Sequence, residues 1–594
     1  MNKIKIYAIC TLAGVALTMT SCKDDFLDKK PTGNYTSDTF YSSDKAVRKG
    51  TEPLFNRAWF DFNRRAIVGM GSYRANDAWN PYVSAEFAKF QVTALTEDMG
   101  LAWSALYNVV TMSNATLFNL ENHCGSEVSE AAKSAAIGEC HLMRGWAYFY
   151  LLRGWGANLL FEDNQTMIDN PIRPLNPETD VLKFIIRDFR KAIEALPEVG
   201  TDNHPSKYAA KAALAKALLA QSGWDNTTKG DHNRNEATLK EVVQLCDEVI
   251  NCGQYALMPN YEDLFKAQNN DNVETILAMR WADPNSGEWG AMNALYSDLA
   301  FPEVTDVNVW GGSLHASIDL IDLYNEDPAD SIRRDATFFT PNEYYSYIKA
   351  ADGGYTYAHN WIQNKKGVLG TKADVAPYTV AQMASPLNTY IQRLADVYLM
   401  KAEAILGNNE VTSDGEALAA FNAVRTRAHV APYTKITFAD LLRERRIEFC
   451  MEYFNWWDMV TYYRWKPQTM LDFFNNQQHR GWEIREGSVL KNPDGTISYR
   501  AVFPGTNNWY LFTTEGYVVW NDCLRAGEND NTIVKTKAQG YDYVATRDAL
   551  LSEKGADYQP VMLSETNIFM PYPESDVIQN HYLKEAPQPY DFGE

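Results

Sequence analysis

The sequence predicts a mainly α fold, in which a scaffold of tetratricopeptide-like helical hairpins carries a loop-rich half with a few short strands. Small and apolar residues recur every three or four positions in paired segments, as helices that pack in hairpins require. Two stretches, about 260–385 and 466–594, largely lack this period and are irregular, the first being rich in Gly, Pro, Asn and aromatic residues. Hydrophobic residues make up 45% of the 594 residues, which is ample for a large core.

The first predicted hairpin pairs residues 100–121 with residues 127–154 across a short turn at 124–126. Positions that advance by three or four residues along the second segment form one stripe on a helix: Ala131, Ala135, Gly138, Leu142, Gly145, Phe149 and Leu152. The small residues of this stripe predict close helix packing.

Further helices follow at 178–196, 206–222 and 236–251, and another pair at 388–406 and 415–428. Leu196-Pro197 ends one helix and Ser206 can cap the next. Thr437 and Asp440 have the spacing of a capping box, which opens a helix that runs toward Trp465. The spacing between hairpins drifts, so the sequence indicates TPR-like hairpins and not a tandem array.

The loop-rich half has two local signals. A short helix is expected near 315–325, and Asn492 to Gly495 can turn a hairpin between Val489 and Tyr499. Long loops in a compact protein usually carry function.

The amino terminus has the layout of a secretory signal, with Lys3 and Lys5 ahead of an apolar run from Ile6 to Leu17. This run is shorter than the roughly 20 apolar residues that span a bilayer as a helix. Residues 19–22, Met-Thr-Ser-Cys, resemble the bacterial lipobox, which implies cleavage before Cys22 and a lipid anchor on Cys22. The expected organisation is a signal peptide at 1–21, a lipidated cysteine and tether at 22–42, and a single domain at 43–594. Within that domain, the helical scaffold covers about 43–260 and 385–465.

The net charge of −21 becomes −23 once residues 1–21, with two lysines and no acids, are removed. An acidic surface repels polyanions, which disfavours nucleic acid and makes strongly anionic glycans poorer ligands than neutral ones. The cysteines show no CxxC spacing and the histidines no HExxH motif, so the sequence indicates no metal or cofactor. A structural calcium ion is left open, because oxygen-rich loops such as Asn269 to Asn272 are too generic to decide it.

Several segments resemble, in the expected order, the SusD/RagB family of outer-membrane nutrient-binding lipoproteins. They are "FLDKKPTGNYTSDTFYSSDKAV" at 26–47, "ECHLMRGWAYFYLLRGWGANLLF" at 139–161, "RLADVYLMKAEAIL" at 393–406, "FNAVRTRAHV" at 421–430, "LLRERRIEFCMEYFNWWDMVTYYRW" at 441–465 and "FMPYPESDVIQN" at 569–580. Two departures occur: Tyr453 stands where the family usually has glycine, and Asn455 where a basic residue is common.

The resemblance implies a SusD-like fold and a protein without catalytic activity. Such proteins act as a lid on a SusC-like TonB-dependent transporter and hand it oligosaccharides, or in some members peptides. In that context Lys23-Asp24-Asp25, next to the lipidated cysteine, resembles a signal for export to the outer face of the outer membrane.

Candidate ligand residues follow from sugar chemistry, because the C–H faces of neutral sugars stack on aromatic rings while Asn, Asp or Arg binds the hydroxyls. Covering roughly 80 Å² of apolar surface per ring contributes on the order of 2 kcal/mol. The first cluster comprises Tyr73, Arg74, Asn76, Asp77, Trp79, Asn80 and Tyr82, and the second Trp281, Trp289, Tyr296 and Trp310. A third, weaker candidate is Tyr355, Tyr357 and Trp361.

Other tryptophans receive different assignments. Trp146, Trp155, Trp456 and Trp457 lie on predicted scaffold helices and are assigned to packing, whereas Trp482, Trp509 and Trp520 could edge the site or face a transporter.

Two further functions are left open. A TPR-like groove can bind peptides, and a glycoside hydrolase needs a carboxylate pair, for which 76 acidic residues offer too many candidates to be informative.

Overall fold

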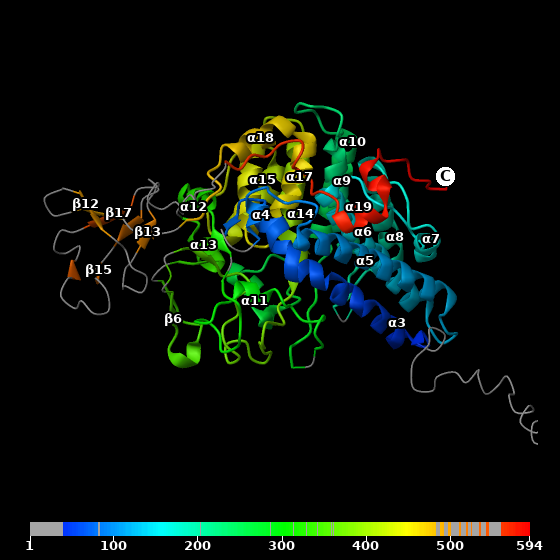
Figure 1. Ribbon diagram of the computed structural model, residues 1–594, viewed down its shortest axis with the longest axis horizontal. Coiled ribbons are helices and arrows are strands. Elements are labelled where there is room, and N and C mark those ends of the chain that lie inside the picture. Colours follow the sequence, from blue (N-terminus) through cyan, green and yellow to red (C-terminus); the bar gives the residue numbers. More distant parts are fainter. Residues whose placement is uncertain are drawn as a thin grey trace, which may run out of the picture.

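The computed structural model describes residues 40–482, apart from 81–83, 202, 286, 313, 328, 341–342, 358 and 360, and residues 560–593. Between 488 and 545 it describes only short strands, without their side chains. The signal segment and Cys22 therefore lie outside the described residues. In Figure 1 the blue, cyan and yellow helices form the scaffold, and the green segments of the loop-rich half lie along one side of it.

The scaffold is a series of antiparallel helices that pack on their neighbours in chain order. Helix α6 packs on α5 and α8, α9 on α8 and α10, and α14 on α10 and α15. Their bounds are α5 Glu97–Asn122, α6 Glu130–Trp155, α8 Glu178–Ala195, α9 Lys207–Gly223, α10 Glu236–Ile250, α14 Leu394–Leu406 and α15 Gly415–Arg427. The predicted hairpins are confirmed, with ends that agree within three residues except at 388, where a strand precedes α14.

Close packing explains the small residues of the α6 stripe. A Cβ atom added to Gly145 would lie 2.5 Å from a ring carbon of Phe189 on α8, and one added to Gly138 would lie 2.7 Å from Leu196. Glycine therefore sets the distance between α6 and α8.

The predicted helix from Thr437 to Trp465 is wrong in one respect, because it is broken in the middle. The capping box of Thr437 and Asp440 opens α16 (Phe438–Phe449), and a second helix, α17 (Asn455–Trp465), follows. Between them Met451 and Tyr453 have φ values of 62° and 70°, which an α-helix cannot contain. Helix α18 (Pro467–Asn475) then closes the scaffold.

Short antiparallel strands organise the loop-rich half. One sheet has the order β1-β3-β7-β4, from Ala78–Trp79, His315–Ala316, Gln363–Asn364 and Phe338–Phe339. Strand β2 (Thr275–Met279) pairs with β8 (Thr389–Arg393), and the expected short helix is α12 (Ile318–Asn325). The predicted hairpin is confirmed, since β11 (Ser488–Lys491) pairs with β12 (Ile497–Arg500) and Val489 lies opposite Tyr499.

A buried network of ion pairs joins the two halves. The Glu448 carboxylate, on α16, contacts Nη1 of Arg393 at 2.6 Å and Nη1 of Arg333 at 3.0 Å, and it also pairs with Arg427. All four side chains are at most 4% exposed. Arg333 belongs to α13 (Ser331–Thr337) of the loop-rich half, whereas the other residues belong to the scaffold or its edge. Despite burial, the arginines hold the pKa of Glu448 well below its ordinary value.

None of the helices in the described parts of the chain combines the length and apolar character that crossing a bilayer requires.

Replacing Glu448 with glutamine is expected to lower the free energy of unfolding by about 3–5 kcal/mol, because it leaves buried arginines without their counter-charge. Urea unfolding followed by circular dichroism measures this difference. The matched control, Glu410→Gln, changes an exposed glutamate and should leave the unfolding midpoint in place. Equal midpoints for all three proteins would contradict a structural role for the network.

Because the pKa of Glu448 is lowered in the folded protein, the free energy of unfolding depends on pH. The stability that Glu448 contributes is complete above the ordinary glutamate pKa of about 4.3 and is lost as pH falls below that value. Between pH 5 and 3 the unfolding free energy of the wild type is therefore expected to fall more steeply than that of Glu448→Gln. Parallel pH curves for the two proteins would show that Glu448 does not titrate in this way.

Candidate functional site

The structure builds the first predicted cluster into the core. Its described members are at most 6% exposed, namely Tyr73, Arg74, Asn76, Asp77, Trp79 and Asn80, and Tyr82 lies outside the described residues. Side chains buried to this degree have almost no surface to offer a ligand in this conformation.

Arg74 shows what the polar members of this cluster do. Its guanidinium lies between the rings of Phe90 and Trp456, with the Cζ atom 4.0 and 4.3 Å from the two centroids. It donates hydrogen bonds to the backbone carbonyls of Asn567 and Ile568, which ties the carboxy-terminal segment to the scaffold. Burial lowers the pKa of Arg74 to about 9.

Asp77 has a similar internal role. Its carboxylate accepts hydrogen bonds from Nε of Arg446 at 3.0 Å and from Nδ2 of Asn455 at 2.6 Å. Burial raises the pKa of Asp77, and these two partners oppose the shift. Asn455, which replaces a basic residue common in the family, thus has a defined partner.

The second cluster divides into two buried and two exposed rings. Trp281 is 5% exposed and donates to Oγ1 of Thr389 at 3.1 Å, and the hydroxyl of Tyr296 lies 3.0 Å from the carbonyl of Gly370. Trp289 and Trp310 are 54% and 68% exposed. The second cluster therefore presents only Trp289 and Trp310 to a ligand.

The third cluster contains a stack of three rings that the sequence did not predict as a unit. The indole of Trp361 stacks with the imidazoles of His315 and His359, with centroid distances of 4.6 and 4.8 Å and interplanar angles of 21° and 28°. All three residues are partly exposed, whereas Tyr357 lies fully buried behind them. Exposed Trp310 lies five residues before His315 in the segment that leads into β3, and we call Trp310, His315, His359 and Trp361 together the aromatic ledge.

The small four-stranded sheet positions this ledge. His315 on β3 pairs directly with Gln363 on β7, so Trp361 lies diagonally across from His315, within reach of an aromatic side chain. On the other side of β3, Trp79 is the register partner of His315. Trp79 is thus the one member of the first cluster that the strand register places beside the ledge.

The buried amide of Gln363 fixes the rings from below. Its Oε1 atom accepts hydrogen bonds from Nε1 of Trp361 and the hydroxyl of Tyr357, both at 3.2 Å. A Cβ atom on Gly312 would lie 1.4 Å from Nε2 of Gln363, so the chain between Trp310 and His315 crosses directly over this amide, and a larger residue at 312 would displace it.

The ledge is uncharged near neutral pH. Burial lowers the pKa of His315 to about 4, and burial also lowers the pKa of His359, against the opposing effect of Glu303. The nearest described carboxylate oxygen, on Glu303, is 3.9 Å from Nε2 of His359. Neutral rings, of which Trp361 is held by the Gln363 amide, are suited to the C–H faces of an uncharged ligand.

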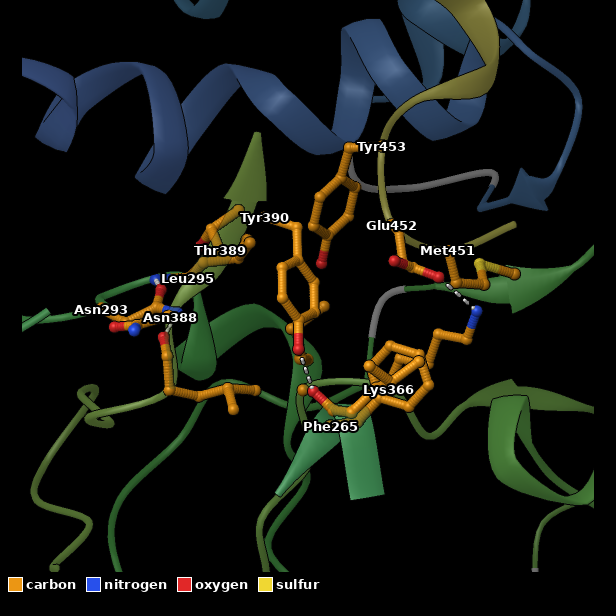
Figure 2. Close-up of a pocket in the computed structure, with 14 residues that line it drawn as sticks. Phe265, Asn293, Leu295, Lys366, Asn388, Thr389, Tyr390, Met451, Glu452 and Tyr453 are labelled. Atoms are coloured by element: carbon orange, nitrogen blue, oxygen red, sulfur yellow. Dashed lines mark hydrogen bonds and ion pairs between the residues drawn. The ribbon is translucent and has the colours of Figure 1, made fainter. Parts of the chain in front are cut away.

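A separate cavity lies deep between the halves and is too small for a sugar (Figure 2). Its volume is about 40 Å³, room for a few water molecules at about 10–15 Å³ each. Lys366 and Glu452 form an ion pair of 2.9 Å at its wall, and Tyr390 and Tyr453 line it next to each other. This cavity therefore belongs to the junction of the halves and not to a ligand site.

No group of three or more His, Cys, Asp or Glu side chains in the described residues is placed to hold a metal ion. In the Asn269–Asn272 loop, the Asp271 carboxylate already accepts hydrogen bonds from Arg280 and Asn203.

The remaining tryptophans are also placed. Trp146, Trp155, Trp456 and Trp457 are at most 3% exposed, which confirms their packing role. Trp482 is buried, and its backbone N–H donates to the carbonyl of Ala316 on β3, so it supports the ledge from behind. Trp509 and the side chain of Trp520 lie outside the described residues.

Comparisons with known proteins define the class. A SusD family profile matches residues 221–588, and a second profile, described as SusD-like and starch-binding associating with outer membrane, matches residues 25–219. The chain belongs to the SusD family. A SusD-like protein of Bacteroides ovatus is 46% identical over 99% of this chain and 98% of its own length.

Solved structures agree with this assignment. One, determined with a xylogluco-oligosaccharide, is 45% identical, covers 92% of this chain and all of its own, and superimposes with a TM-score of 0.76. A laminarin-binding SusD-like protein, 20% identical over 74% of this chain and 95% of its own, has a TM-score of 0.57 and shows the shared fold.

Because the pKa of His315 is about 4, its imidazole is expected to stay neutral at pH 6, where an exposed histidine with a pKa near 6.5 is largely protonated. NMR of protein with ¹³C-labelled histidine, assigned by a His315→Gln variant, measures this. A free histidine peptide in the same buffer provides the control, since an imidazole with the ordinary pKa near 6.5 should shift between pH 7.5 and 5.5. A His315 resonance that moves in parallel with it would contradict the buried, neutral assignment.

Proposed function

We propose that this protein is a cell-surface lipoprotein that captures oligosaccharides on the aromatic ledge and delivers them to a SusC-like TonB-dependent transporter. The observation that carries this proposal is an uncharged, rigid set of rings on the loop-rich half of a SusD-family chain. Lipid on Cys22 would hold the protein to the outer face of the outer membrane, and the tether would let it move over its transporter.

Neutral glycans are the favoured ligands. The relative solved with a xylogluco-oligosaccharide is 45% identical over nearly the whole chain, which makes that glycan the first to test. A net charge of −21 opposes polyanionic glycans, and both imidazoles of the ledge are neutral at pH 7. Two or three rings at about 2 kcal/mol each, less the cost of association, give dissociation constants in roughly the micromolar to millimolar range.

Two alternatives compete with this proposal. A peptide-binding uptake lipoprotein would use the same scaffold, and an acidic chain would favour basic peptides. A glycoside hydrolase is the weaker alternative, because binding by stacked rings requires no carboxylate pair and SusD-family membership implies binding without cleavage.

Trp310→Ala and Trp361→Ala are each expected to weaken binding of a xylogluco-oligosaccharide by about tenfold or more, because each removes a ring of the ledge. Isothermal titration calorimetry on the mature protein measures the affinities. Phe118→Ala, which removes an aromatic residue 57% exposed on α5 of the scaffold, is the matched control and should bind as the wild type does.

Trp289→Ala in the same series tests whether the site extends to this ring. Wild-type affinity in both ledge variants would remove the ledge as the site. Binding of basic peptides without binding of any oligosaccharide would replace the glycan proposal by the peptide alternative. Shorter products after prolonged incubation would support a hydrolase.

A further inference from the structure

A polar cavity of about 280 Å³ lies away from the aromatic ledge, and no ledge residue lines it. Its walls come from three segments: the α8–α9 connection at 200–206, residues 254–255 after α10, and residues 271–276 with Arg280 around β2. The cavity thus lies where the helical scaffold meets the loop-rich half.

Hydrogen bonds within the protein hold these walls in place. Asp271 joins two of the segments, since Oδ2 accepts from Nδ2 of Asn203 and Oδ1 from Nε of Arg280, each at 3.0 Å. The backbone N–H of Ala256 donates to the carbonyl of Val273 at 3.0 Å, and Gln254 donates to the carbonyl of Glu198 at 2.8 Å. A site fixed in this way loses little conformational entropy when a ligand binds.

The charges around the cavity are already balanced. Arg280 pairs with Asp271, and its guanidinium lies 5.4 Å from the ring centroid of Phe55. His204 and Arg48 each lie 2.8 Å from the same Oε1 atom of Glu139. A ligand with a net charge would find no unpaired opposite charge here, so the cavity favours an uncharged one.

The lining nevertheless has hydrogen-bonding capacity to spare. The hydroxyl oxygen of Thr275 is buried and has no hydrogen-bond partner among the described atoms. The Arg280 side chain makes one hydrogen bond to the described residues, from Nε to Asp271. Its Nη groups therefore remain available to donate to a ligand. Tyr255 adds a ring and a hydroxyl, the latter 3.3 Å from Oγ of Ser206.

We propose that this cavity is a second saccharide site, which takes one neutral sugar ring independently of the ledge. A sugar presents several hydroxyl groups, each of which donates and accepts, and this matches the hydroxyl, amide and guanidinium groups of the lining. By the measure used for the smaller cavity, this volume has room for roughly 20 water molecules at about 10–15 Å³ each, enough for a single hexose or pentose. The two sites differ in kind, because the ledge offers ring faces and the cavity offers polar groups.

Saturation-transfer difference NMR with glucose, galactose and xylose, and with glucuronate as an anionic comparison, tests this proposal on the mature protein. We expect a neutral monosaccharide to bind, and Thr275→Val to weaken it by about fivefold, the effect of losing one hydrogen bond. Tyr255→Phe provides a second hydroxyl deletion in the same cavity. Thr434→Val, at an exposed threonine of the scaffold, is the matched control and should bind as the wild type does.

The outcomes separate the two sites. Monosaccharide binding that persists in Trp310→Ala and falls in Thr275→Val supports the cavity, whether or not the ledge binds oligosaccharides. The proposal is overturned if none of the neutral monosaccharides binds, or if only glucuronate gives a signal. It is also overturned if the signal is lost in Trp310→Ala but unchanged in both cavity variants. Titration of the ledge variants with the oligosaccharide decides the proposed function separately.

Discussion

Three buried arginines converge on the carboxylate of Glu448, and the arrangement of the two halves depends on this contact. Arg393 ends strand β8 and Arg427 ends α15, while Arg333 comes from α13, so one carboxylate holds three elements that are distant in sequence. Helix α13 runs directly into β4, which pairs with β7, the strand that carries Gln363. The ion pairs in the core are thereby linked to the position of the aromatic ledge through a short, hydrogen-bonded path.

Forming such a network costs desolvation free energy, because several charges leave water. It stabilises the fold only while every charge keeps its partner. Glu274 and Glu444 supply the further carboxylates: Glu274 contacts Arg393 at 2.7 Å, and Glu444 contacts Arg333 at 2.7 Å. The chain also accepts local strain beside the network. Tyr453, at a position where the family usually has glycine, has a φ of 70°, and a Cβ atom on Gly71 would lie 2.5 Å from its carbonyl oxygen. Glycine at position 71 therefore leaves room for the backbone of Tyr453, the residue that departs from the family pattern.

The scaffold could be predicted from the sequence because helical periodicity is local: α8 and α9 begin and end within one residue of their predicted bounds. Strand β8 and the break at Met451 to Tyr453 could not, since both depend on distant partners. The first cluster was misleading for a physical reason, because its alternating aromatic and polar residues serve a buried cation–π sandwich and a buried ion pair. The sequence singled out Trp310 and Trp361 of the ledge, but in two separate clusters. His315 joins it through the register of two-residue strands, which are too short to leave a pattern in the sequence. His359 lies in the loop before β7 and joins it through its ring contact with Trp361.

In the proposed function, the loop-rich half presents the aromatic ledge as a preformed surface for a neutral glycan. A crystal structure of the mature protein with a xylogluco-oligosaccharide is the decisive experiment. We expect sugar rings against Trp310 and the stack of His315, Trp361 and His359, with those side chains placed as they are without ligand. An oligosaccharide bound elsewhere on the molecule, with the ledge uncovered, would contradict it.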